Sequence, residues 1–105
     1  YIPDRFKDGY GPNLTLKKKF SKEKTNLIIF VDCGTNSFDE INFLNSNGIK
    51  SIIIDHHKIE NFRVNPSVFI NSLKSPDYKK YNFFCSTNLV FFLLRFIIFK
   101  SNGRC

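Results

Sequence analysis

Two short apolar runs, each followed by an aspartate, constrain this chain more than any other feature. Leu27–Val31 precedes Asp32, and Ser51–Ile54 precedes Asp55. The runs are continuous and rich in β-branched residues instead of alternating with polar ones, which is typical of strands buried on both faces of a parallel sheet. We therefore expect two buried, parallel strands.

The residues between these runs predict a helix. Ser37 and Glu40 have the spacing of a capping box. Apolar residues recur at helical spacing from Phe38 to Leu44, and Asn47-Gly48 supplies a stop signal. Strand, helix and strand together predict a βαβ unit.

The flanking segments extend this prediction. Val68–Ile70 predicts a short third strand, and Ser86–Phe99 predicts a helix whose apolar side chains face a core. Upstream, residues 1–13 indicate a strand end followed by an ordered loop, and residues 14–24 a basic, weakly helical segment. The expected fold class is α/β, with a mostly parallel sheet and flanking helices.

Length and composition limit what surrounds this unit. The chain has 105 residues and is 42% hydrophobic, which fits one small globular domain and excludes a disordered chain. It contains no methionine and begins at Tyr1. We interpret residues 1–105 as one partial domain of a longer protein, truncated at both ends.

Charge and cysteine content indicate partners and compartment. Sixteen Lys and Arg against nine Asp and Glu give a net charge of +7, which favours anionic partners such as nucleic acid. The most apolar stretch, residues 89–99, is shorter than the ~20 residues of a membrane span and contains Arg95. Three scattered cysteines predict neither a disulfide framework nor a zinc site. We expect a cytoplasmic protein without membrane association.

Ionisable residues follow both predicted strands. Parallel strands end at the same sheet edge, so Asp32 should lie near Asp55, His56 and His57. Carboxylate and imidazole ligands without thiolate suit Mn²⁺ or Mg²⁺. Paired ions of this kind activate water and neutralise phosphate oxygens, so the pattern predicts a metal-dependent phosphoesterase.

Asp55-His56-His57 after a strand, together with Val31-Asp32-Cys33-Gly34 one βαβ unit earlier, resembles the DHH phosphoesterase superfamily. The opening residues 1–11, YIPDRFKDGYG, more narrowly resemble the RecJ group of single-strand-specific 5′ to 3′ DNA exonucleases. The resemblance implies single-stranded DNA as the partner and a parent protein in DNA repair and recombination.

The resemblance also implies roles for individual residues. Asp32 and His56 correspond to metal ligands, and His57 to the histidine that contacts the scissile phosphate. Asp55 corresponds to a supporting catalytic carboxylate, and Arg5 to a phosphate contact. Family members bind two ions with further aspartates, from an Asp-x-Asp segment and a downstream position, that this chain does not match. The chain alone is therefore expected to be inactive.

Two other hypotheses remain open at this stage. One is a different DHH phosphoesterase that acts on short oligonucleotides, cyclic dinucleotides or pyrophosphate. The other is a non-catalytic DHH descendant that only binds DNA or a protein. Retention of Asp32 and the Asp-His-His triplet disfavours the second hypothesis, because such descendants typically lose metal ligands.

Overall fold

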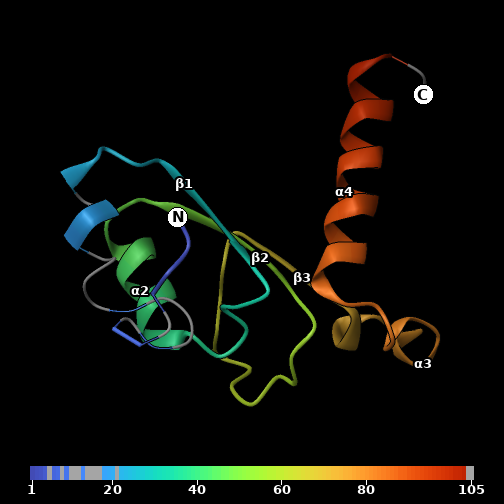
Figure 1. Cartoon of the computed structure of the whole chain (residues 1–105), viewed down its shortest axis with the longest axis horizontal. Coiled ribbons are helices and arrows are strands. Elements are labelled where there is room, and N and C mark those ends of the chain that lie inside the picture. Colours follow the sequence, from blue (N-terminus) through green and yellow to red (C-terminus); the bar gives the residue numbers. More distant parts are fainter. Residues whose placement is uncertain (5, 8, 10–12, 14–17, 21, 104–105) are drawn as a thin grey trace.

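The computed structural model describes residues 1–4, 6–7, 9, 13, 18–20 and 22–103 (Figure 1). Its strands and helices are β1 (Leu27–Val31), α2 (Phe38–Ser46), β2 (Lys50–Asp55), β3 (Val68–Asn71), the 3₁₀ turn η1 (Ser72–Lys74), α3 (Tyr78–Tyr81) and α4 (Ser86–Ser101). Residues 18–20 and 22 are also helical, in the basic segment where weak helix was predicted. In the part of the chain that is described, no helix combines the length and apolar character needed to cross a membrane.

The three strands form one parallel sheet in the order β1-β2-β3. Val31 pairs with Ile54, and Asp55 pairs with Asn71. The α/β class, the parallel sheet and the flanking helices are therefore confirmed. This register brings the carboxyl ends of all three strands to one edge.

Helix α2 covers one face of the sheet. Its fully buried Ile41 and Leu44 belong to one apolar cluster with Ile28, Phe30 and Ile53 of the strands. Each such burial stabilises the fold by roughly 1.5–3 kcal/mol. The helix ends before Gly48, whose φ of 69° is the left-handed conformation that the predicted stop signal requires.

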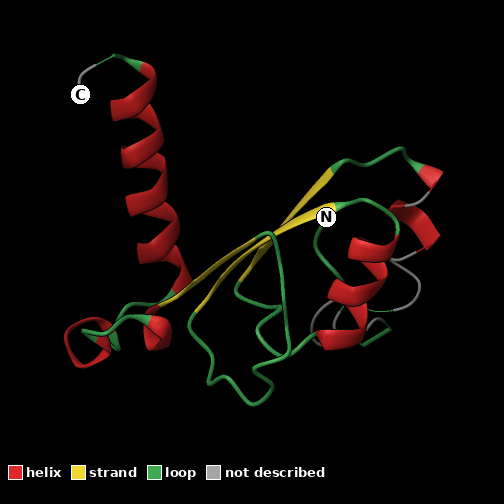
Figure 2. Cartoon of the chain, turned by 180° about the vertical axis from the view of Figure 1, so that it is seen from behind, coloured by secondary structure: helices red, strands yellow, loops and turns green. Residues whose placement is uncertain are grey.

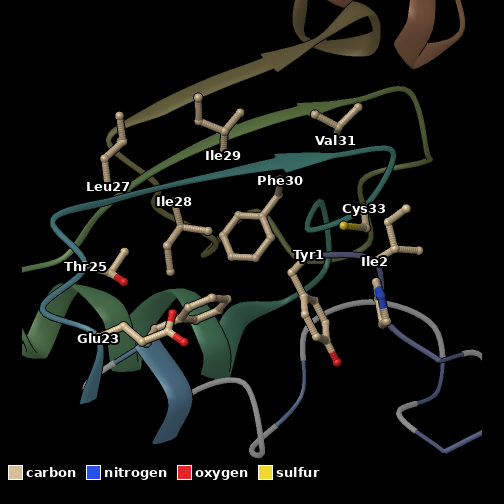
Figure 3. A pocket seen from close by; sticks show the side chains of 12 residues that line it. Tyr1, Ile2, Glu23, Thr25, Leu27, Ile28, Ile29, Phe30, Val31 and Cys33 are labelled. Atoms are coloured by element: carbon tan, nitrogen blue, oxygen red, sulfur yellow. The ribbon is translucent and has the colours of Figure 1, made fainter.

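The prediction that β1 is buried on both faces is wrong. Ile28 and Phe30 point toward α2, whereas Leu27, Ile29 and Val31 point to the opposite side (Figure 3). These three side chains remain 47%, 53% and 48% exposed. An apolar run shows that both faces of a strand are suited to burial. In the described residues, however, only the face of β1 that carries Ile28 and Phe30 is covered.

The predicted capping box of α2 is also wrong. Ser37 precedes the helix, but with ψ of 61° it leaves the extended conformation of a typical N-cap. Its side chain makes no capping hydrogen bond within the described residues. Its backbone N–H instead donates to Gly34 in a tight turn. The reciprocal box lies at α4, between Cys85 and Asn88.

Helix α4 was predicted to face a core, and this prediction is wrong as well. Figures 1 and 2 show its C-terminal part projecting away from the sheet and from α2, although the helix also contacts β2. Seven of its large apolar side chains, between Phe91 and Phe99, are 47% to 59% exposed, whereas Leu89, Val90 and Leu93 are partly buried and only Ser86 is buried. Upstream, Tyr1–Asp4 are not in a strand, contrary to the predicted strand end.

Candidate metal and phosphate site

The strand ends bring four potential metal ligands together. Asp32 follows β1 and Asp55 ends β2, and the Asp32 N–H extends the ladder by donating to the Ile54 carbonyl at 3.0 Å. One ligand atom from each of Asp32, Asp55, His56 and His57 lies within 4.8 Å of the other three. The predicted meeting of these residues at one sheet edge is what the structure shows.

Asp32 is held in an uncommon backbone conformation. Its φ is 62°, the left-handed region that residues other than glycine rarely adopt. This turn places its carboxylate Oδ1 3.2 Å from His56 Nε2. Strained residues persist only where surrounding contacts fix them, and they cluster at functional sites.

Asp55 is the buried centre of the site, with 1% of its surface exposed. Its Oδ1 accepts the backbone N–H of His56 at 2.8 Å and contacts His57 Nδ1 at 2.6 Å, and its Oδ2 accepts the N–H of Thr35 at 3.2 Å. Burial alone would raise the pKa of this carboxyl group. Hydrogen bonds from Thr35, the His57 ring and the two histidine N–H groups outweigh burial and lower the pKa below its ordinary value.

Asn71, at the end of β3, ties the neighbouring loops to this centre. Its Nδ2 donates to the His57 carbonyl at 2.9 Å and to Thr35 Oγ1 at 3.3 Å. Its Oδ1 accepts the N–H of Leu73 at 2.9 Å. Asn71 and Thr35 are both buried, so they form a polar network beneath the histidines. Such a network fixes side-chain orientation when its members are paired.

The loop between β1 and α2 forms one wall of a cavity of about 310 Å³. Residues 33–37, Asp55 and His57 line this cavity. Asn36 fixes the facing loop, because its Nδ2 donates to the Lys58 carbonyl at 3.0 Å and its Oδ1 accepts the Glu60 N–H at 2.8 Å. A small anionic group placed here would lie against His57.

A second groove, of about 530 Å³, runs along β1 (Figure 3). Its lining is mainly apolar and includes Tyr1, Ile2 and Phe30, with Glu23 as its acidic member. The clustered ligands lie outside this groove. We therefore place the chemistry at the smaller cavity, where Asp55 and His57 are part of the wall.

The donor set fits a hard divalent cation. Cis ligands about 2.1 Å from an octahedral ion lie roughly 3 Å apart, which matches the 3.2 Å between Asp32 Oδ1 and His56 Nε2. Burial, and then the charges of Asp55 and Asp32, raise the pKa of the adjacent Cys33 thiol to about 11. Cys33 is not among the four side chains whose ligand atoms converge, so the donors are carboxylate and imidazole groups, which suit Mn²⁺ or Mg²⁺.

Sequence reasoning assigned no role in the site to Asn71, Thr35 or Ser86. Asn71 could have been found, because the strand-end argument used for Asp32 applies equally to the third strand. Thr35 and Ser86 carry no comparable signal, since both reach the site through tertiary packing. Arg5, the predicted phosphate contact, lies outside the described residues.

Comparison with known proteins adds independent observations. The sequence model of the "DHH family, N-terminal domain" matches residues 1–104. The chain is similar to the single-stranded-DNA-specific exonucleases RecJ of Bacillus subtilis, with 43% identity over 58 residues, and of Thermus thermophilus, with 31% identity over 80 residues. These alignments cover 55% and 76% of the chain.

A solved structure is similar as well. It is the crystal structure of exonuclease RecJ bound to manganese, with a TM-score of 0.64 and 30% identity over 73% of this chain. The alignment covers 20% of that protein. The alignments with the Bacillus subtilis and Thermus thermophilus proteins cover 7% and 12% of the length of those proteins, so the chain spans a small part of each.

Proposed function

The chain belongs to the DHH family, and from this premise we propose that it is part of a metal-dependent phosphodiesterase that degrades single-stranded DNA from the 5′ end. We further propose that residues 1–105 are a partial DHH domain that is inactive alone. The observation that carries the proposal is the cluster of Asp32, Asp55, His56 and His57, whose ligand atoms lie within 4.8 Å of one another.

Similarity to named relatives supports the choice of substrate. The matched curated proteins are single-stranded-DNA-specific exonucleases, and the matched crystal structure contains manganese. The net charge of +7 favours a polyanionic substrate. Long single strands are therefore our first choice over short oligonucleotides or cyclic dinucleotides.

We assign the ion to Asp32 and His56, whose facing atoms have the separation expected of neighbouring ligands. When bound, a divalent cation lowers the pKa of water and neutralises charge on phosphate oxygens. Asp32 is half-exposed, so a ligand can approach it from solvent. Arg5 remains our proposed contact to a neighbouring phosphate of the strand.

We assign His57 to the scissile phosphate and Asp55 to its support. The pKa of Asp55 is lowered, so this carboxylate is ionised at neutral pH and accepts a hydrogen bond from the His57 Nδ1–H group. That hydrogen bond fixes the ring orientation and directs Nε2 to the phosphate side. Asp55 thus orients a catalytic residue, in the manner of carboxylates that support histidines at metal sites.

The test uses the intact protein with Mn²⁺ alone and then with DNA. Wild type should bind Mn²⁺ in an electron paramagnetic resonance titration and should degrade 5′-labelled single strands faster than duplexes or dinucleotides. Asp32→Ala and His56→Ala should weaken Mn²⁺ binding by more than the about 10 to 100-fold expected of supporting residues. Asp39→Ala, an exposed acidic change on α2, is the matched control and should leave binding unaltered.

Each rival function predicts a different result. A non-catalytic DNA-binding descendant would bind DNA without Mn²⁺ and would release no nucleotides. A phosphoesterase for small substrates would hydrolyse dinucleotides faster than long strands. Either result would overturn the proposed substrate, and normal turnover by Asp32→Ala would overturn the metal assignment.

A further inference from the structure

The first residue of α4 contacts the metal site across 54 positions of sequence. Ser86 Oγ donates a hydrogen bond to Asp32 Oδ1 at 3.0 Å. Ser86 is 3% exposed, so its hydroxyl is held away from solvent. We infer that Ser86 is a positioning residue that orients the Asp32 carboxylate for the ion, an inference that rests on the proposed function.

Asp32 has the most exposed side chain of the cluster, because His56 and His57 are 36% and 43% exposed. Asp55 is buried and accepts several hydrogen bonds, whereas the Asp32 side chain is 54% exposed. A half-exposed carboxylate on a short side chain samples several rotamers unless a neighbour selects one. Ser86 approaches the same oxygen that faces His56, so it selects the rotamer in which Asp32 and His56 point together.

The start of α4 is built to hold this hydroxyl still. The Cys85 N–H donates to Asn88 Oδ1 at 3.3 Å, and the Cys85 carbonyl accepts the Leu89 N–H at 3.3 Å. These bonds fix the first turn of a helix that contacts β2. The backbone of Ser86 is thereby held where its hydroxyl donates to Asp32.

A hydroxyl donor suits this role chemically. It carries no charge, so it does not compete with a cation for the carboxylate as Lys or Arg would. It engages one of the two in-plane lone pairs of Asp32 Oδ1, so it does not by itself block a bond from the other lone pair to a metal ion. Removing the Ser86 hydroxyl should therefore leave the Asp32 carboxylate in place but less well oriented. This predicts weaker Mn²⁺ binding that an excess of Mn²⁺ overcomes.

The experiment compares Ser86→Ala, Ser86→Gly and Ser86→Thr in the intact protein. Mn²⁺ affinity is measured by electron paramagnetic resonance without DNA, and thermal unfolding is measured without metal. We expect the Ala and Gly variants to bind Mn²⁺ about 10 to 100-fold more weakly, as other changes behind metal ligands do. Thr keeps the hydroxyl and should restore the affinity toward wild type.

Ser101→Ala is the matched control on the same helix. Its hydroxyl donates to the Ile98 carbonyl at 3.0 Å, in an exposed position at the far end of α4. It should bind Mn²⁺ as wild type does. If the Ala and Gly variants unfold at a lower temperature than wild type but bind Mn²⁺ with the same affinity, the positioning role is overturned and Ser86 is a packing residue.

The two proposals fail in distinguishable ways. Wild type that does not bind Mn²⁺ overturns the proposed function and this inference with it. Wild type that binds Mn²⁺, alongside Ser86→Ala and Ser86→Gly of equal affinity, overturns this inference alone. A raised Mn²⁺ requirement for DNA cleavage, with recovered turnover at saturating Mn²⁺, supports it.

Discussion

Gly34 is the position where a single methyl group tests the packing behind the site most directly. Its φ is 101°, a conformation that L-residues rarely adopt. A Cβ built there would meet Phe30 Cβ at 3.2 Å and Ile53 Cγ1 at 3.3 Å. Both neighbours belong to the core cluster beneath the sheet, so neither can move without disturbing it.

The expected cost of Gly34→Ala has two parts. Forcing Ala into left-handed backbone destabilises by about 1–2 kcal/mol. Adding a methyl group to a filled core costs a further 1–3 kcal/mol, roughly. Together these give a loss of about 2–5 kcal/mol in the free energy of unfolding. That is a large fraction of the 5–15 kcal/mol, roughly, that stabilises a typical domain.

Gly48→Ala separates the two parts. Gly48 has φ of 69°, and nothing lies within 4 Å of its added Cβ, so this variant measures the backbone cost alone. We expect the free energy of unfolding in urea to be lower for Gly34→Ala than for Gly48→Ala by at least the packing cost of about 1–3 kcal/mol, because φ of 101° lies further from the left-handed minimum than φ of 69°. Mn²⁺ affinity should also fall only in Gly34→Ala, because Gly34 lies two residues after the proposed metal ligand Asp32, in the loop between β1 and α2. Equal unfolding free energies for the two variants would refute the packing argument.

Three further predictions follow from the titrating groups. The pKa of Asp55 is lower in the folded state, so its contribution to the free energy of unfolding is complete above the unfolded pKa of about 3.9 and is lost as pH falls through the folded pKa. In Asp55→Asn, the free energy of unfolding should therefore fall less steeply toward acid pH than in wild type. The pKa of Cys33 is raised to about 11, so its contribution to the free energy of unfolding is complete below the unfolded pKa of about 8.5 and is lost as pH rises toward 11. If Cys33→Ala lost as much unfolding free energy at alkaline pH as wild type does, this prediction would be contradicted. A hydrogen bond from the Asn88 backbone lowers the pKa of the exposed Cys85 thiol, so maleimide at neutral pH should modify Cys85 before Cys33 in a Cys105→Ser background, as peptide mass spectrometry would show.

The meeting of Asp32 with the Asp-His-His triplet could be predicted because it depends only on local patterns. Continuous apolar runs predict parallel strands, and parallel strands end at one edge. No long-range contact has to be known for this step. The same reasoning, applied to the third strand, would have added Asn71 to the site.

Burial was harder to predict than position. Leu27, Ile29 and the apolar residues of α4 are as hydrophobic as core residues, but an apolar pattern states what a segment can bury and not what is there to cover it. In the described residues, α2 covers one face of the sheet, and α4 contacts it at β2. The cap of α4 escaped prediction for another reason, because Cys85 is not among the usual N-cap residues.

The site divides into a rigid half and an adjustable half. Asp55, Thr35 and Asn71 are buried and hydrogen-bonded to one another or to His57, so the ends of β2 and β3 and the loop after β1 fix the phosphate side. Asp32 is half-exposed, and its carboxylate accepts a hydrogen bond from Ser86, which belongs to a helix that begins more than fifty residues later. Metal affinity should therefore respond to anything that shifts the start of α4, whereas the orientation of His57 should not. Mn²⁺ affinity and the orientation of His57 can be measured in the same α4 variant, and only the affinity should change.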